Sequence, residues 1–307
     1  MKVKDFSFRS ATGICDIHGC EFVPEQTPRA VVAIHHGMAE HMERYAEFVD
    51  YLTSKGIAVF MHDMANHGRS NQNPDDLGFF GKKDGWLGLI KDYKTVFELS
   101  KKEYPDKKHI VFGHSMGSFV VRCFDARYPS LSDCSVYMGT GGTNDAAGIG
   151  IKVSDLIAAV KGAHHRSKLM DQLAFGKYNA KFEKRTAYDW LTRDNRIVDQ
   201  YVADPLCGFM FTIKGMNDLL HLNTAANCDE WYSKIRKDLP VLLISGAQDP
   251  VGEYSKGIDE VYDKLIKSGH TAVAEKLYPE CRHEVLNELN KEEVYDDIYS
   301  FITETED

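Results

Sequence analysis

The chain has 307 residues, of which 43% are hydrophobic and 27% charged, and its formal net charge at pH 7 is −9. This composition is typical of a soluble globular enzyme, and the acidic balance argues against general nucleic-acid binding or strong attraction to anionic membranes. The seven cysteines are scattered without a C-x-x-C pair, so the sequence suggests neither a zinc ribbon nor a disulfide framework and favours reduced thiols in the cytoplasm. The N-terminal sequence has no apolar h-region and no run reaches bilayer-spanning length, so we expect neither a signal peptide nor a transmembrane segment.

Short apolar runs alternate with helical patterns along most of the chain. Residues 1–28 alternate apolar and polar side chains around two glycines, which predicts a β-hairpin. Buried strands are expected next at 30–37, 57–63, 109–113, 134–139, 240–246 and 272–278. Helices are expected at 43–55 and 85–103. A last helix starts with the capping pattern of Asn290 and Glu293. Such strands, buried on both faces and alternating with helices, predict a mostly parallel sheet flanked by helices.

The rhythm of strands and helices breaks after the fourth buried strand. No convincing strand occurs between 140 and about 235, where only helical patterns are found, such as 153–163 and 195–205. We therefore predict a helical cap at 141–235, inserted between two parts of an α/β core, 1–140 and 236–307. The cap should cover the edge of the sheet at which the strands have their carboxyl ends.

The strand-like run before Gly113 leads into Gly113-His114-Ser115-Met116-Gly117 and then into a helical pattern. A serine between two glycines at such a strand–turn–helix junction is typical of a nucleophile elbow. The turn strains the serine backbone, and the glycines allow the neighbouring chain to approach closely. The hydroxyl of Ser115 is then exposed, and the amide of Met116 lies at a helix N-terminus, where negative charge is stabilised.

A serine hydroxyl needs a base, and the base needs an acid that fixes its tautomer. Asp249 follows the strand 240–246 and His283 follows the strand 272–278, in the chain order that this type of fold requires. Glu280 is a weaker candidate for the acid because it is too close to His283 in the sequence. These positions predict a Ser115–Asp249–His283 triad.

An oxyanion hole needs a second backbone amide from the loop after an early strand. Gly37 permits a turn at the end of 30–37, so that the Met38 amide can face Ser115 beside that of Met116. Three histidines in this region, His35, His36 and His41, have no acidic partner at ligand spacing nearby. We therefore interpret them as loop-packing residues and predict no metal site.

Five segments of the chain resemble the monoglyceride lipase and lysophospholipase group of α/β-hydrolases, a group also described as serine aminopeptidase-like. They are HHGMAEHMERYAEF, FMHDMANHGRS, GHSMGS, LLISGAQDPVG and YPECRHEVLNE. The resemblance runs from about residue 6 to 303, and one departure is GHSMGS in place of the commoner GHSMGG. It implies the same triad and oxyanion amides, and it implies that Glu40 and Arg44 contact the polar head of an ester. The alternative for these two residues is a surface ion pair at i, i+4.

The motifs together predict a serine hydrolase that cleaves carboxylic esters of lipids, such as monoacylglycerols or lysophospholipids, without a metal or organic cofactor. A short-chain carboxylesterase or thioesterase remains an alternative, and an aminopeptidase or a non-catalytic binding protein of the same fold is a further one. The segment 161–185 holds seven Lys or Arg against one Asp and one Glu. It is either a solvated helix face or a basic edge through which the cap contacts lipid surfaces.

Overall fold

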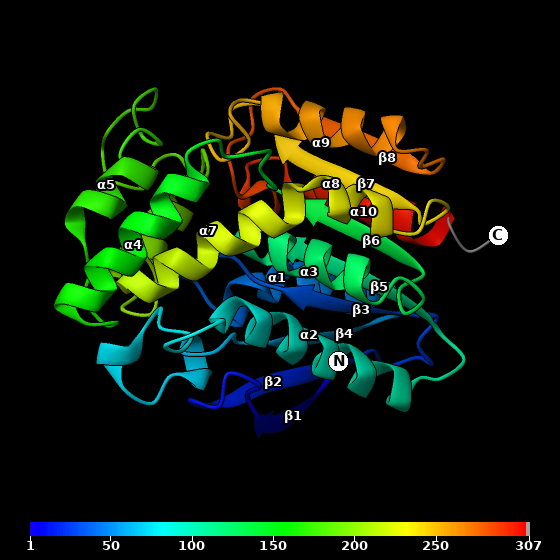
Figure 1. Ribbon diagram of the computed structural model, residues 1–307. Helices are drawn as coiled ribbons and strands as arrows, with labels where there is room; N and C mark the ends of the chain where they lie inside the picture. Colours follow the sequence, from blue (N-terminus) through cyan, green and yellow to red (C-terminus); the bar gives the residue numbers. More distant parts are fainter. Residues whose placement is uncertain (305–307) are drawn as a thin grey trace.

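The computed structural model describes residues 1–304 and is built around an eight-stranded sheet (Figure 1). The order of its strands is β1-β2-β4-β3-β5-β6-β7-β8; β1 and β2 pair antiparallel, as do β2 and β4, and the other pairs are parallel. The strands are β1 (Lys2–Arg9), β2 (Asp16–Val23), β3 (Ala30–His35), β4 (Ile57–His62), β5 (Lys108–His114), β6 (Cys134–Met138), β7 (Val241–Gly246) and β8 (Val273–Tyr278). The predicted hairpin and the mostly parallel sheet are confirmed.

Helices cover both faces of the sheet because its central strands are apolar on both sides. Val32 and Ile34 of β3 join the cluster under α1 (Ala46–Ser54) and α10 (Lys291–Glu304), whereas Val31 and Ala33 join the cluster on the opposite face. The helices on that opposite face are α2 (Gly85–Glu103), α3 (Met116–Arg127) and α9 (Lys256–Lys267). The helix predicted at 85–103 is observed with these bounds, and the one predicted at 43–55 begins with a 3-10 turn at Met42–Tyr45.

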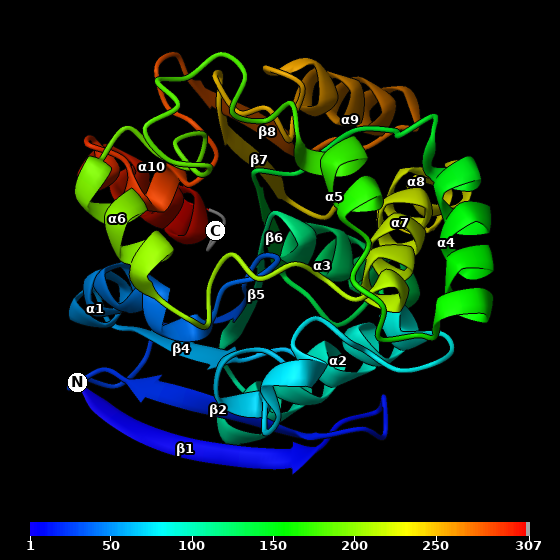
Figure 2. The ribbon, with the colours of Figure 1, turned by 90° about the vertical axis from the view of Figure 1, so that its left-hand side faces the viewer.

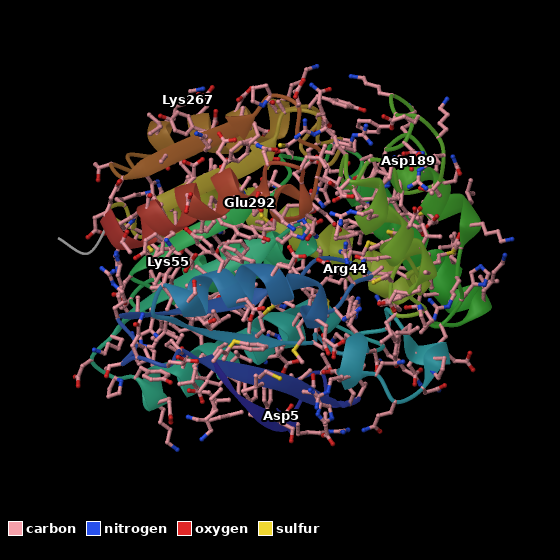
Figure 3. All side chains as sticks on the ribbon, turned by 180° about the vertical axis from the view of Figure 1, so that it is seen from behind. Asp5, Arg44, Lys55, Asp189, Lys267 and Glu292 are labelled. Carbon is pink, nitrogen blue, oxygen red and sulfur yellow. The ribbon has the colours of Figure 1, made fainter. Side chains whose placement is uncertain are left out.

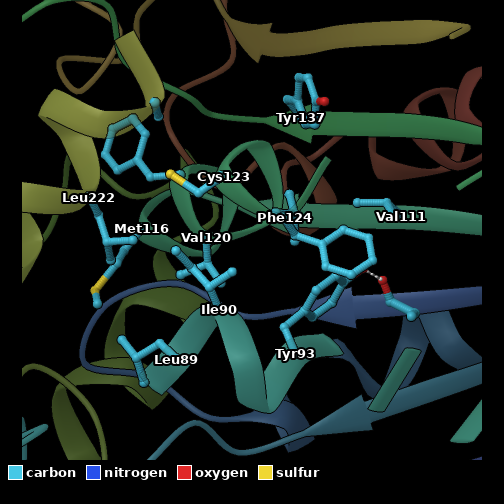
Figure 4. Packing of buried hydrophobic residues seen from close by; sticks show 14 of the residues in the cluster. Leu89, Ile90, Tyr93, Val111, Met116, Val120, Cys123, Phe124, Tyr137 and Leu222 are labelled. Atoms are coloured by element: carbon cyan, nitrogen blue, oxygen red, sulfur yellow. Dashed lines mark hydrogen bonds between the residues drawn. The ribbon is translucent and has the colours of Figure 1, made fainter. Parts of the chain in front are cut away.

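The packing of α2 and α3 on the sheet fixes where α3 begins. Figure 4 shows Ile90 and Tyr93 of α2 against Val120 and Phe124 of α3, with Val111 of β5 beside Phe124. The hydroxyl of Tyr93 donates to the carbonyl oxygen of Ala33 in β3 at 2.8 Å. Because protein interiors are close-packed, this contact set leaves α3 little freedom to shift. The N-terminus of α3, where Ser115 lies, is therefore held at the carboxyl edge of the sheet.

Residues 141–235 form helices between β6 and β7, and the described residues of this segment contain no strand. The helices are α4 (Ala147–Lys161), α5 (Lys168–Phe175), α6 (Asn195–Ala203), α7 (Ile213–Asn227) and α8 (Asp229–Lys234), and Figure 2 shows α4, α5 and α7 on one side of the molecule and α6 on the other. Two hydrogen bonds of the buried Arg122 attach the insertion to α3. The Arg122 guanidinium donates to the carbonyl of Ala226 at the end of α7, and the Arg122 carbonyl accepts from the indole of Trp231 in α8. The division into a core and a cap at 141–235 stays a prediction.

No helix in the described part of the chain combines the length and the apolar character needed to cross a bilayer.

Candidate active site

Ser115 occupies the turn between β5 and α3 with a backbone conformation that serine rarely adopts. Its φ is 54° and its ψ is −122°, and its amide donates to the carbonyl of Met138 in β6 at 2.9 Å. A Cβ on Gly117 would lie 2.4 Å from the carbonyl oxygen of His35, and one on Gly113 would lie 2.6 Å from the Gly117 carbonyl oxygen. Both glycines are thus required by close backbone contacts, and the strain at Ser115 is held by the surrounding structure.

His283 and Asp249 follow β8 and β7 and meet at the same edge of the sheet as Ser115. His283 Nδ1 lies 2.8 Å from Asp249 Oδ2, and both side chains are buried. Asp249 also accepts the amide of Val251 at 2.8 Å, which orients its carboxylate. Gly139 follows the Met138 carbonyl that holds Ser115, and a Cβ added to it would lie 3.1 Å from the His283 ring. Nδ1 is thus engaged by Asp249, and Nε2 is the nitrogen left for a substrate or nucleophile.

Burial alone would lower the pKa of His283, but the Asp249 carboxylate outweighs it and raises the pKa above the ordinary value of 6.5. The nearby carboxylates of Glu284 and Glu40 add to the rise. A histidine with a raised pKa is a stronger proton acceptor and carries its charge over a wider range of pH.

The loop after β3 runs directly against the serine. A Cβ on Gly37 would lie 3.2 Å from the Cβ of Ser115, so the Gly37–Met38 turn borders the nucleophile candidate. In the part of the chain that the structure describes, the amides of Met38 and Met116 have no hydrogen-bond acceptor, whereas the amides of Gly37 and Ala39 on either side of Met38 are both bonded. Two free donors beside one serine can bind a developing oxyanion.

Glu40 is the centre of a buried network beneath this loop. Its Oε1 accepts from the Gly37 amide at 2.6 Å, from the Tyr45 hydroxyl at 2.9 Å and from His114 Nδ1 at 3.1 Å. Its Oε2 accepts from Arg44 at 2.6 Å. Burial would raise the pKa of Glu40, but His114 and Arg44 together hold it well below the usual range. The carboxylate therefore stays charged and fixes the turn that presents the Met38 amide.

Arg44 extends this network to the loop after β8 that carries His283, called the histidine loop below. Its guanidinium donates two hydrogen bonds of 2.6 Å to the carboxylate of Glu284, the residue after His283. Figure 3 shows Arg44 between α1 and the inserted helices. The alternative of an i, i+4 ion pair is observed for Glu40 and Arg44, but the pair is buried and not at the surface, since the two side chains are 4% and 10% exposed. Contact of the two residues with a substrate head group stays a prediction.

The insertion supports the histidine loop directly. The amide of Glu284 donates to the carbonyl of Leu191 at 2.7 Å, and Arg282 donates to the carbonyl of Asp189, which is labelled in Figure 3, at 2.5 Å. The ring of Trp190 lies 5.2 Å from that of His283, measured between centroids. Sequence reasoning missed these contacts because backbone pairing between distant loops leaves no periodic signal.

The other residues considered in the sequence analysis, Glu280, His36 and His41, have partners outside the predicted triad. Glu280 pairs with Arg193 on the surface and does not contact His283. His36 packs between its own loop and the loop after β4: its Nε2 accepts from the Met64 amide, and its Nδ1 donates to the Gly37 carbonyl. His41 has no acidic partner at ligand spacing close by in the sequence, but its Nε2 lies 2.8 Å from Oδ2 of Asp204, which is 163 residues away in the insertion.

Comparison with known proteins agrees with this architecture. The family model described as "Serine aminopeptidase, S33" (Hydrolase_4) matches residues 26–290. The chain belongs to this family. A monoacylglycerol lipase of Mycolicibacterium smegmatis is 28% identical over 308 residues, with 97% of this chain and 96% of that protein covered. The monoglyceride lipase of Homo sapiens is 25% identical, with 87% and 83% covered.

Solved structures give the same result. The crystal structure of a highly thermostable carboxyl esterase from Bacillus coagulans in complex with glycerol superimposes with a TM-score of 0.93 at 28% identity and covers 99% of both chains. The predictions of an α/β-hydrolase fold, of a hydrolase and of resemblance to the monoglyceride lipase group are therefore confirmed.

Glu40→Gln should lower kcat on a soluble ester by about 10- to 100-fold with little change in KM, because the neutral amide holds the Gly37 turn less firmly and oxyanion donors are sensitive to placement. Steady-state kinetics on protein shown to be folded by circular dichroism measures this. Glu43→Gln, at the exposed neighbouring carboxylate, is the matched control and should leave kcat unchanged. Equal kcat values for both variants and the unmodified protein would remove Glu40 from the positioning of the loop.

The pH dependence should follow the raised pKa of His283. A histidine that acts as a general base must be neutral, so we expect kcat/KM to fall as the pH drops through a pKa above 6.5. Asp249→Asn removes the carboxylate that raises this pKa, so the acid limb of the residual activity should move to lower pH. An acid limb at the same pH in both proteins would show that Asp249 does not act on the titrating group.

Proposed function

We propose that the chain is a serine hydrolase that cleaves carboxylic esters of lipids, with monoacylglycerols or lysophospholipids as the substrate class. The observation that carries the proposal is the bonded pair of His283 and Asp249 at the sheet edge where Ser115 is held at φ 54°. The names of the relatives, monoacylglycerol lipase, monoglyceride lipase and carboxyl esterase, support the ester substrate.

The proposed mechanism assigns one task to each group. Ser115 Oγ attacks the ester carbonyl while His283 Nε2 takes its proton, and Asp249 stabilises the imidazolium through Nδ1. The amides of Met38 and Met116 bind the oxyanion. His283 then gives the proton to the leaving alcohol, and a water activated by the same histidine releases the acid from the acyl-enzyme. No step of this scheme draws on a metal or an organic cofactor.

The alternative functions differ in what they need from the site. A short-chain carboxylesterase or a thioesterase uses the same groups, so only substrate preference distinguishes it. An aminopeptidase needs a carboxylate that binds the free amine, but Glu40 and Glu284, which lie next to the proposed machinery, are both paired with Arg44. A binding protein would need neither the bonded pair of His283 and Asp249 nor its placement at the same sheet edge as Ser115.

Substrate preference and mechanism can be tested together. p-Nitrophenyl esters from two to sixteen carbons, with monoolein and lysophosphatidylcholine alongside, should give the highest kcat/KM on a long acyl chain. Ser115→Ala should lower kcat by about 10⁶-fold, and Asp249→Asn should lower it by about 10⁴-fold through the wrong histidine tautomer. A preference for acetate esters would favour the carboxylesterase, and undiminished turnover by the folded Ser115→Ala variant would exclude the mechanism.

We also propose that the cap contacts lipid surfaces through an apolar ridge on α4 and α5. By the ridge we mean the six exposed apolar side chains of these two helices, Ile149, Val153, Leu156, Val160, Leu169 and Leu173, with relative exposures from 38% to 75%. Exposed Lys152, Lys161 and Lys168 lie on the same two helices or at their ends. Exposed apolar side chains together with lysines on the same helices are typical of an interfacial surface.

The basic segment 161–185 supports this contact less well than the ridge does. Within this segment, Lys181 Nζ lies 3.4 Å from the centroid of the Tyr254 ring, and the Arg185 guanidinium donates a hydrogen bond to the carboxylate of Asp199. Two of the cations predicted to face lipid are thus engaged within the molecule. The apolar ridge is therefore the better target for a test.

Replacing Leu169 and Leu173 by Gln should weaken binding to anionic vesicles about tenfold or more, because two leucines lose their partial burial in the lipid. Hydrolysis of monoolein in those vesicles should fall in parallel, and hydrolysis of a soluble butyrate ester should not change. Ile266→Gln, at an exposed apolar residue of α9, is the control for added polarity alone. Equal losses on both substrates would indicate a folding defect, and no loss on either would exclude the ridge as the contact surface.

A further inference from the structure

Three side chains of different donor types meet between the loop that follows β3 and the insertion. His41 comes from that loop, three residues after Met38, and Asp204 and Cys207 come from the chain just after α6. The imidazole nitrogen, the carboxylate oxygen and the thiol sulfur all lie within 4.8 Å of one another. His41 and Cys207 are buried, and Asp204 is partly exposed. None of the three belongs to the proposed hydrolytic machinery.

The backbone arranges these donors before any ligand arrives. The Cys207 amide donates to the Asp204 carbonyl at 3.0 Å, closing a turn that places both side chains on one side. The Leu206 amide donates to Asp204 Oδ1 at 2.8 Å, so that Oδ2 is the oxygen facing His41. The Gly208 amide and the Tyr201 hydroxyl both donate to the carbonyl of Ala39, at 2.9 and 3.0 Å, which fixes the turn against the loop.

The three donors border a cavity of about 220 Å³, which is also lined by Arg44, Tyr201 and Asn287. A cation approaching through it would meet the guanidinium of Arg44, but this charge is already matched by the carboxylates of Glu40 and Glu284. Once Cys207 has lost its proton, the donor set carries two negative charges against the two positive charges of a divalent ion. Charge therefore does not exclude a cation from this position.

We propose that His41, Asp204 and Cys207 form a binding site for a thiophilic divalent cation of the zinc class. One imidazole, one carboxylate and one thiolate are ligands that this ion accepts in tetrahedral sites, and three protein ligands leave the fourth position for a water in the cavity. On binding, the Cys207 thiol releases one proton to solvent. His41 binds through Nε2 with its proton on Nδ1, and the hydrogen bond to Asp204 is replaced by two bonds to the ion.

The site goes beyond the proposed ester hydrolysis, because it joins the loop carrying Met38 to the insertion. An ion held by His41 on one side and by Asp204 and Cys207 on the other would cross-link the two segments. Ligands that bind the folded state alone raise its stability, so the cation should stabilise the attachment of α6 to the loop.

Cobalt(II) is the probe, since a thiolate bound to this ion gives a charge-transfer absorption in the near ultraviolet. Titration of the reduced, folded protein should produce that absorption with one equivalent of ion. Cys207→Ser should abolish it, and Asp204→Asn and His41→Gln should each weaken the affinity at least tenfold. Cys228→Ser, at a partly exposed thiol outside the cluster, is the matched control and should bind like the unmodified protein.

The change in Tm on addition of zinc is a second measurement, which does not depend on ester hydrolysis. Zinc should raise the Tm of the unmodified protein and of Cys228→Ser by a few degrees, and it should raise that of Asp204→Asn by clearly less, because weaker binding stabilises the folded state less. The Asp204→Asn amide can still bond His41, so this variant is expected to fold even if Cys207→Ser does not. No thiolate absorption in the folded protein, an absorption that survives Cys207→Ser, or equal Tm shifts in every variant would each overturn the site.

Discussion

The close contact between the start of α3 and the end of β3 is the constraint on which the rest of the site depends. Gly117 has no room for a Cβ because the carbonyl oxygens of His35 and His36 would lie 2.4 Å from it. This contact brings the N-terminus of α3 against the loop that begins at Gly37. The same approach of two backbones accompanies the positive φ of Ser115 and places this residue beside the Gly37–Met38 turn.

A second layer of interactions is electrostatic and connects the parts of the site that come from distant segments. Glu40 holds the turn at Gly37, and Arg44 joins Glu40 to Glu284, the neighbour of His283. Buried ion pairs contribute little net stability, but breaking one leaves an uncompensated charge, which is costly. We therefore interpret this network as one that fixes the relative positions of the loop after β3 and the loop that carries His283.

Local patterns were sufficient to predict the parts of the molecule that depend on periodicity and on motif spacing. The helix α2 was predicted with its bounds because Leu89, Tyr93 and Val96 recur at helical spacing, and Asp249 and His283 were located by the strands before them. The pairing of Arg44 with Glu284 joins residues 240 apart in the sequence, and that of His41 with Asp204 joins residues 163 apart. Such pairs depend on how loops fold back on each other, and neither composition nor spacing records this.

The central claim, that Ser115 is the nucleophile activated by His283, is tested most directly by covalent labelling. The protein is treated with a fluorophosphonate at neutral pH, and the modified peptide is identified by mass spectrometry. The account predicts one phosphonyl group per chain, attached to Ser115, with labelling strongly slowed in Asp249→Asn. Labelling at a different residue, or no labelling of the folded protein, would contradict it.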